Sequence, residues 1–169
     1  MFENYVTAYI RHLTNLKNIL DKAKVWQEEM KIKDDVILGA RLALDMFPLA
    51  MQIRGVTNFA RQSGSALCSI EYPKFEDNET NLLQLQERID KSITFLSALQ
   101  PEQVANDLET RMVPISWMPG KGFVAKYFLE VYAHDNFYFH CTVAYTILRH
   151  YGLKIGKSDF TGQIELKDL

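Results

Sequence analysis

The chain has 169 residues, of which 47% are hydrophobic and 24% are charged, with 19 lysines and arginines against 21 aspartates and glutamates. This composition is typical of one globular domain, here residues 1–169, and it excludes an intrinsically disordered chain. The formal charge of −2 gives no overall attraction to nucleic acid or to an anionic membrane, so we expect neither as a partner.

The first predicted element is an amphipathic helix over residues 2–24. Apolar side chains recur there at steps of three and four, and charged residues largely fill the opposite side. A connection follows, with a short helical stretch over residues 36–44 that Gly39 interrupts. A second long helix is predicted over residues 45–68, with Asp45 as a plausible N-cap.

The middle of the chain alternates a loop with a third helix. Residues 69–78 contain Pro73 and are predicted to form a loop. The third helix is predicted over residues 79–99, with Thr80 as a candidate cap and seven apolar side chains on its buried side. Pro101 ends this helix and opens a single turn, because proline cannot continue an α-helix.

The last third of the chain combines a hairpin signal with a long helix. Between residues 109 and 124, β-branched and aromatic residues surround Pro119–Gly120, which predicts a small hairpin or an ordered loop. The fourth long helix is predicted to begin within residues 121–124 and to reach about residue 151, and Gly152 ends it. The tail after it is glycine-broken and too short to predict another helix.

These elements predict an all-α four-helix bundle with a small hairpin or ordered loop before the last helix. Helices of about 20 residues are roughly 30 Å long and bury their apolar stripes against one another. Because two of the connections are long, an up-down-up-down order is not forced. The last helix is apolar or aromatic nearly all round, so we expect the hairpin, the tail or a second subunit to cover it, and we expect a homodimer.

Cysteine content and hydropathy indicate a cytoplasmic protein. The two cysteines, Cys68 and Cys141, are too few for a disulfide scaffold and lack the spacing of a metal knuckle. Residues 1–10 have no basic region followed by an apolar run, so they do not resemble a signal peptide. No window approaches the roughly 18 apolar residues that a membrane-spanning helix needs.

One polar group on the last helix is the main candidate site. Asn136 and His140 lie four positions apart on one face, and Gln52 on the second helix is the natural third member. Amide oxygen is a weak ligand for zinc or nickel, so we expect no metal, although a divalent Ni, Zn or Mn ion would use these three residues if one were bound. Either Asn136 and His140, with or without Gln52, hydrogen-bond each other inside the bundle, or the group binds a small ligand or metal.

The remaining histidines and the cysteines favour structural roles. His12 lies at the flank of the first helix, His134 lies on another face of the last helix, and His150 lies in its final turn. Cys141 follows His140 directly, so the two side chains diverge by about 100° and cannot form a nucleophile–base pair.

Five runs of sequence carry a family resemblance: residues 44–52, 85–96, 136–140, 144–153 and 156–160, which together extend over nearly the whole chain. They resemble a bacterial and fungal family of unknown function that is similar to the DinB/YfiT-like metalloenzyme superfamily. The resemblance implies a four-helix bundle with up-down-down-up connectivity and frequent dimerisation.

The resemblance also implies a metal centre, of which this chain has one of the three histidines. The wider superfamily typically holds a divalent metal with three histidines, one on the second helix and a His-x-x-x-His pair near the last long helix. Several members are thiol-dependent transferases or hydrolases. Matched to this sequence, the pair falls on Asn136 and His140 and the remaining position falls within residues 48–52, so only one histidine of three is present.

Three functions follow from these observations. The first is a DinB-like bundle with a degenerate metal centre that binds a small molecule through Gln52, Asn136 and His140. The second is a metal- or thiol-dependent transferase or hydrolase, with His140 as ligand or general base and the two amides orienting the reactant. The third is a structural dimeric interaction module. The sequence leaves open whether the protein is an enzyme, and it names no substrate, metal or biological process.

Overall fold

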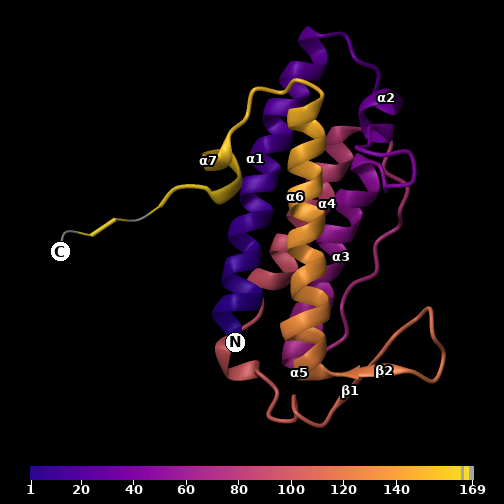
Figure 1. Ribbon diagram of the computed structural model, residues 1–169. Helices are drawn as coiled ribbons and strands as arrows, with labels where there is room; N and C mark the ends of the chain where they lie inside the picture. Colours follow the sequence, from indigo (N-terminus) through magenta and orange to yellow (C-terminus); the bar gives the residue numbers. More distant parts are fainter. Residues whose placement is uncertain (165, 168–169) are drawn as a thin grey trace.

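The computed structural model describes residues 1–164, 166 and 167. Its long helices lie side by side as a bundle (Figure 1): α1 (Ala8–Glu29), α3 (Leu49–Cys68), α4 (Leu82–Ser97) and α6 (His134–His150). In Figure 1, α1 and α6 run upward and α3 and α4 run downward, so the connectivity is up-down-down-up. Helix α3 packs against α4 and α6, and α1 packs against α4. The predicted all-α bundle is confirmed.

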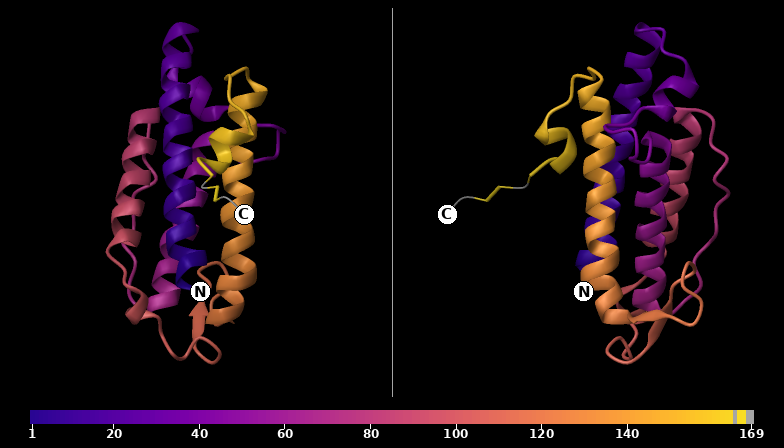
Figure 2. Two further views of the ribbon diagram at one scale, coloured as in Figure 1. Left: turned by 90° about the vertical axis from the view of Figure 1, so that its left-hand side faces the viewer. Right: turned by 45° about the vertical axis from the view of Figure 1, so that its right-hand side comes forward.

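The crossover lies between α3 and α4. Residues 69–81, which we call the strap, contain neither helix nor strand. They run along the outside of the bundle from the end of α3 to the start of α4, as Figures 1 and 2 both show. The loop over residues 69–78 is therefore confirmed, and it allows two consecutive helices to run in the same direction.

The first half of the chain departs from the predicted boundaries. A π-helical turn, Glu3–Thr7, leads into α1, which continues five residues beyond the predicted end. Helix α2 (Asp34–Gly39) stops at Gly39 instead of continuing to residue 44. The N-cap of α3 is Pro48 and not Asp45, because Pro48 has an extended backbone with ψ 168° and helical geometry begins only after it.

Helix α4 is shorter than predicted at both ends. Its N-cap is Asn81 and not Thr80, because the Asn81 side chain accepts a hydrogen bond of 2.9 Å from the Gln84 backbone N–H. The single turn predicted at Pro101 is a 3₁₀-helix, Pro101–Gln103.

The predicted hairpin is present at the end of the bundle where α3 ends (Figure 1). Strands β1 (Met112–Pro114) and β2 (Gly122–Val124) pair antiparallel. The chain then passes through α5 (Ala125–Tyr127) and a π-helical segment, η3 (Phe128–Ala133), directly into α6.

The prediction that the tail forms no helix is wrong. Residues Lys157–Thr161 form α7, where the Asp159 carboxylate accepts a hydrogen bond of 2.7 Å from the Gly156 backbone N–H. The Phe160 ring packs against His12 and Tyr145, with ring centroids 5.5 and 5.7 Å apart. Packing of this half-buried ring adds stabilisation that the local sequence lacks. Of the three alternatives for covering the last helix, the tail therefore accounts for part of α6.

The interior of the bundle is apolar. Residues Leu13, Ile53, Leu85 and Phe137, one from each long helix, are fully buried. Within the described residues, no helix combines the length and the hydropathy that a bilayer crossing requires.

Candidate functional site

The structure joins two members of the predicted polar group. His140 Nδ1 lies 2.7 Å from Gln52 Oε1, and the Gln52 Nε2 donates a hydrogen bond of 2.9 Å to the Phe47 carbonyl. A carbonyl can only accept, so the Gln52 atom that contacts Phe47 is the amide nitrogen and the atom that contacts His140 is the amide oxygen. His140 Nδ1 therefore carries the proton and donates it, and in the neutral ring Nε2 is an acceptor. Gln52 is 1% exposed and His140 is 8% exposed, so this hydrogen bond is shielded from water.

Asn136 does not complete the group. Its amide Nδ2 donates a hydrogen bond of 2.7 Å to the Tyr132 carbonyl, four residues earlier in its own helix. Asn136 and His140 share a helix face as predicted, but the Asn136 amide reaches its own backbone within one turn. The predicted hydrogen bond between Asn136 and His140 is therefore not formed, and His140 pairs with Gln52 instead.

The His140 ring is held between α3 and aromatic neighbours. A Cβ atom on Gly55 would lie 2.8 Å from ring atoms of His140, so only glycine permits this approach. The Phe59 ring stacks on His140 with a centroid distance of 5.7 Å and an interplanar angle of 17°. Burial lowers the pKa of His140, so the imidazole is neutral at physiological pH.

The residues at this position do not fit a three-histidine metal centre. His140 supplies one imidazole nitrogen, while the Gln52 oxygen is already the acceptor for His140 Nδ1. Among residues 1–164, 166 and 167, no group of three His, Cys, Asp or Glu side chains is placed to hold a metal ion. Amide oxygen is a poor substitute for imidazole with zinc or nickel, so we derive no step through a metal.

The thiols of this chain are also poor reactants. Cys68 and Cys141 are free and buried. Burial raises the pKa of both thiols, which keeps them protonated and therefore weakly nucleophilic.

The other histidines lie elsewhere in the bundle. His12 is buried against Phe137 and Tyr138, not merely at the flank, and burial together with the charge of Arg11 lowers its pKa. His134 faces Tyr5 and Tyr9, away from His140, and His150 is exposed at the end of α6.

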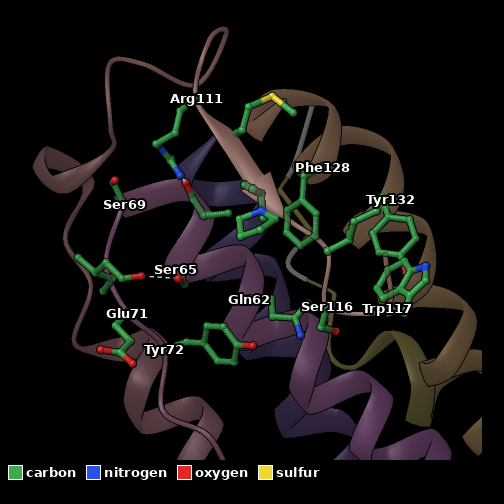
Figure 3. A pocket seen from close by; sticks show the side chains of 16 residues that line it. Gln62, Ser65, Ser69, Glu71, Tyr72, Arg111, Ser116, Trp117, Phe128 and Tyr132 are labelled. Carbon is green, nitrogen blue, oxygen red and sulfur yellow. Dashed lines mark hydrogen bonds between the residues drawn. The ribbon is translucent and has the colours of Figure 1, made fainter. Parts of the chain in front are cut away.

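A cavity of about 530 Å³ lies at the hairpin end of the bundle (Figure 3). We call it the hairpin cavity. Its walls come from the last turns of α3, the first residues of the strap, β1 with the loop after it, and η3. The lining residues are Gln62, Ser65, Ala66, Ser69, Ile70, Glu71, Tyr72, Arg111, Met112, Val113, Pro114, Ile115, Ser116, Trp117, Phe128 and Tyr132. Gln52, Asn136 and His140 do not line it.

Local geometry explains how α3 and the hairpin enclose this space. Ser69 ends α3 in a left-handed conformation with φ 54°, and the Ser65 hydroxyl donates to the Ile70 carbonyl, which turns the chain outward. Arg111 donates from Nη2 to the Ala66 carbonyl near the C-terminus of α3 and from Nε to Asp107 Oδ1 at 2.9 Å. The hairpin is thereby tied to the end of α3, where a cation is favoured by the helix dipole.

An aromatic series connects the hairpin cavity with His140. Trp117 and Tyr132 have ring centroids 5.6 Å apart, and the Phe59 ring centroid also lies 5.6 Å from that of Tyr132. Phe59 in turn stacks on His140. Burial raises the pKa of Tyr132, so its hydroxyl stays protonated.

Two buried arginines hold the strap that forms one wall of the cavity. Arg61 on α3 is 1% exposed, donates from Nη1 to the Pro73 carbonyl, and has its guanidinium carbon 3.7 Å from the centroid of the Phe75 ring. Burial, and then the charge of Arg88, lower the pKa of Arg61 to about 10, so it remains charged at neutral pH.

Arg88 on α4 is 3% exposed and fixes the second half of the strap. It donates to the Glu76 carbonyl at 3.0 Å and to Glu79 Oε1 at 2.7 Å, and Arg54 donates to Glu79 Oε2 at 2.7 Å. Burial alone would raise the pKa of Glu79, but the hydrogen bonds from Arg88 and Arg54 lower it. A buried cluster of this kind anchors the strap across both α3 and α4.

Sequence reasoning missed the hairpin cavity and the arginine cluster, although one residue of each has a position in the sequence that could have indicated it. Arg88 lies within the apolar periodicity of α4, between Leu85 and Ile89, where a charged side chain must be buried with partners. Trp117 is a large aromatic residue in a Pro- and Gly-containing turn, where no core is available to bury it.

Comparisons with known proteins agree with this fold. A crystal structure of a DinB family member protein from Shewanella denitrificans matches the chain with a TM-score of 0.91 and 32% sequence identity, covering 99% of this chain and 95% of that chain. Residues 1–161 match the family described as a domain of unknown function, DUF1993. The chain belongs to the DUF1993 family.

The match places the DUF1993 chain among DinB-like bundles over almost its entire length. The resemblance to an unknown-function family with this fold is therefore confirmed. A search of curated proteins found no match to the DUF1993 chain.

Proposed function

We propose that this DUF1993 protein binds a small molecule in the hairpin cavity and holds no resident metal. The observation that carries the proposal is the cavity itself, whose volume of about 530 Å³ lies within the usual range of ligand sites, roughly 300–1,000 Å³. Aromatic rings and uncharged polar side chains line it together, which is the usual composition of a site that orients an organic ligand.

The experiment is a fragment screen read at the two tryptophans. A library of neutral, anionic and cationic fragments is added to ¹⁵N-labelled protein, and the indole N–H resonances of Trp117 and Trp26 are followed. Trp117 lines the hairpin cavity. Trp26 lies in the last turn of α1, close to Gly152 and outside the hairpin cavity, and serves as an internal control. We expect saturable shifts of the Trp117 resonance alone. If no fragment shifts it, the proposal is wrong.

The polar group of Gln52, Asn136 and His140 is a second place at which a ligand could bind, separate from the hairpin cavity. The binding of a ligand by Gln52, Asn136 and His140 stays a prediction, supported by the free Nε2 of a buried neutral imidazole. Elemental analysis of protein purified without a histidine tag tests the expected absence of a metal. Stoichiometric Ni, Zn or Mn would contradict it.

The fixed tautomer of His140 favours a second candidate function, that of a transferase or hydrolase with His140 as general base. A neutral imidazole whose Nδ1–H is held by Gln52 presents the Nε2 lone pair that a general base needs. The test is hydrolysis of a panel of p-nitrophenyl esters, with and without an added thiol, by wild type, His140→Gln and His150→Gln. This candidate requires an activity that only His140→Gln abolishes.

A homodimer also belongs to the proposal, with a cytoplasmic location. Exposed apolar side chains on the last helical stretch, Tyr127, Val131 and Phe139, support a second copy as the partner. Light scattering coupled to gel filtration should give twice the chain mass, and Phe139→Lys should reduce it to the monomer. A wild-type monomer would contradict the dimer. It would also remove the support for a dimeric interaction module, but it would not affect the proposed binding of a small molecule.

A further inference from the structure

The chemistry of the hairpin cavity indicates what kind of molecule it takes. Its two charged lining residues are Arg111 and Glu71, and neither offers a buried charge that lacks a partner. Arg111 pairs with Asp107, with Nε and Oδ1 2.9 Å apart, and also donates to the Ala66 carbonyl. Glu71 is exposed, and Figure 3 shows it at the opposite side of the cavity from Trp117 and Tyr132. The lining thus offers no unpaired buried charge to a charged ligand.

One side of the cavity is aromatic. Trp117 and Tyr132 lie 5.6 Å apart at an interplanar angle of 35°, and Phe128 lies 5.9 Å from Tyr132. Trp117 is 59% exposed at the tip of the hairpin, although a tryptophan is the side chain whose exposure to water is among the most costly. A flat apolar ligand placed against these rings would cover that surface.

The other side is polar and uncharged. Figure 3 shows the Tyr72 hydroxyl pointing toward the Gln62 amide, with Ser116 beside Gln62. Within the described chain, none of these three side chains makes a hydrogen bond to another residue. Each group can both donate and accept, which suits a ligand edge that presents a donor beside an acceptor.

We propose that the hairpin cavity binds an uncharged aromatic ring that carries an amide or an equivalent donor–acceptor edge. The ring packs against Trp117 and Tyr132, and the edge is hydrogen-bonded by Gln62 and Tyr72. This inference rests on the proposed function, because it names the ligand class of the same cavity.

Four matched probes separate the features of such a ligand. Benzamide has the aromatic ring and the neutral amide, cyclohexanecarboxamide lacks the aromatic ring, benzoate is anionic and benzylammonium is cationic. Each is titrated against the Trp117 and Trp26 indole resonances. Benzamide should shift Trp117 saturably and bind at least about threefold more tightly than each of the other three, as expected for the loss of one contact. Equal or tighter binding of any other probe overturns the inference.

A pair of variants connects the selectivity to the Gln62 amide. Gln62→Leu keeps the approximate size of the side chain but removes both hydrogen-bonding groups, and should weaken benzamide at least about threefold. Gln163→Leu makes the same change at an exposed position in the C-terminal segment and should leave binding unchanged. Unchanged benzamide binding by Gln62→Leu overturns the assigned role of the amide.

The outcomes distinguish the ligand class from the function. Trp117 shifts caused by charged or aliphatic fragments, with benzamide the weaker ligand, reject the class and retain the cavity as a binding site. No Trp117 shift from any fragment of the library or from the four probes rejects both.

Discussion

At position 55 the chain has room only for a hydrogen atom, because the His140 ring lies directly over the Gly55 backbone. The ring cannot easily move away, since Gln52 holds its Nδ1 and Phe59 stacks on its face. The identity of residue 55 therefore controls whether the buried His140–Gln52 hydrogen bond forms.

Gly55→Ala should lower the free energy of unfolding by about 1–3 kcal/mol, because the added methyl group displaces the His140 ring. Gly39→Ala is the matched control, since a Cβ atom there would meet no other atom within 4 Å. We expect that control to be neutral or to stabilise by about 0.4–1 kcal/mol. Urea unfolding measures both, and equal stability of the two variants would contradict the close approach at Gly55.

The buried His140 also predicts the response of stability to pH. Burial lowers the pKa of His140 in the folded chain below its ordinary value of 6.5, so the unfolded chain takes up this proton first as the pH falls. Its contribution is therefore complete above about pH 6.5 and is lost progressively as the pH drops toward the folded-state pKa. The buried His12 adds to the same loss.

His140→Gln should accordingly flatten this dependence. Urea midpoints at about pH 7.5 and about pH 5.5 should differ less in this variant than in wild type. His150→Gln changes an exposed histidine and should retain the wild-type difference. A wild-type pH dependence in His140→Gln would show that this imidazole is not the buried titrating group.

Among the elements, the strap is held by charges rather than by regular hydrogen bonding. Residues 69–81 contain no helix or strand, yet Arg61 and Arg88 donate to their backbone carbonyls from inside the bundle. The strap therefore depends on side chains of α3 and α4, and it carries Tyr72 to the wall of the hairpin cavity.

Arg88→Met should destabilise the protein by about 1.5–3 kcal/mol, because Glu79 loses the hydrogen bond from the buried Arg88 and keeps only the one from the half-buried Arg54. Limited proteolysis should then cut within the strap before the helices. Lys91→Met replaces an exposed cation one turn later on the same helix and should change stability by no more than about 0.5 kcal/mol. Equal resistance of the strap in the two variants would contradict the anchoring role.

The boundaries of the elements were predicted unevenly, and the errors have physical causes. Periodicity located all the long helices because their apolar stripes repeat over several turns. Asp45 and Thr80 were wrong as caps, since Pro48 and Asn81 lie nearer to the first helical residue. Helix α7 was missed because Phe160, which packs against His12 from a distant part of the chain, stabilises it.

At the scale of the whole molecule, the core of the bundle and the loop that covers the hairpin cavity are separable. The buried core lies between the long helices, whereas Ser116 and Trp117 lie on the loop between β1 and β2, outside that core. Changes in this loop should affect ligand binding far more than folding.

Replacing residues 115–121 with Asn-Gly tests this separation. The change keeps the pairing of Pro114 with Gly122 and closes the hairpin with a two-residue turn. The free energy of unfolding should change by no more than about 1 kcal/mol, while saturation-transfer signals of benzamide should disappear. Loss of cooperative unfolding would show that the loop is part of the folding unit.

The sequence by itself determined the long helices and the hairpin, and it selected Gln52, Asn136 and His140 as the candidate polar group. These features depend on the spacing of residues along single helices and on the types of ligand present, both of which can be read from one chain. The tertiary structure decided that Gln52 pairs with His140 while Asn136 bonds its own backbone, that the strap crosses the bundle, and that a cavity forms at the hairpin. Each of these depends on contacts between segments far apart in the sequence, whose relative positions no local pattern specifies.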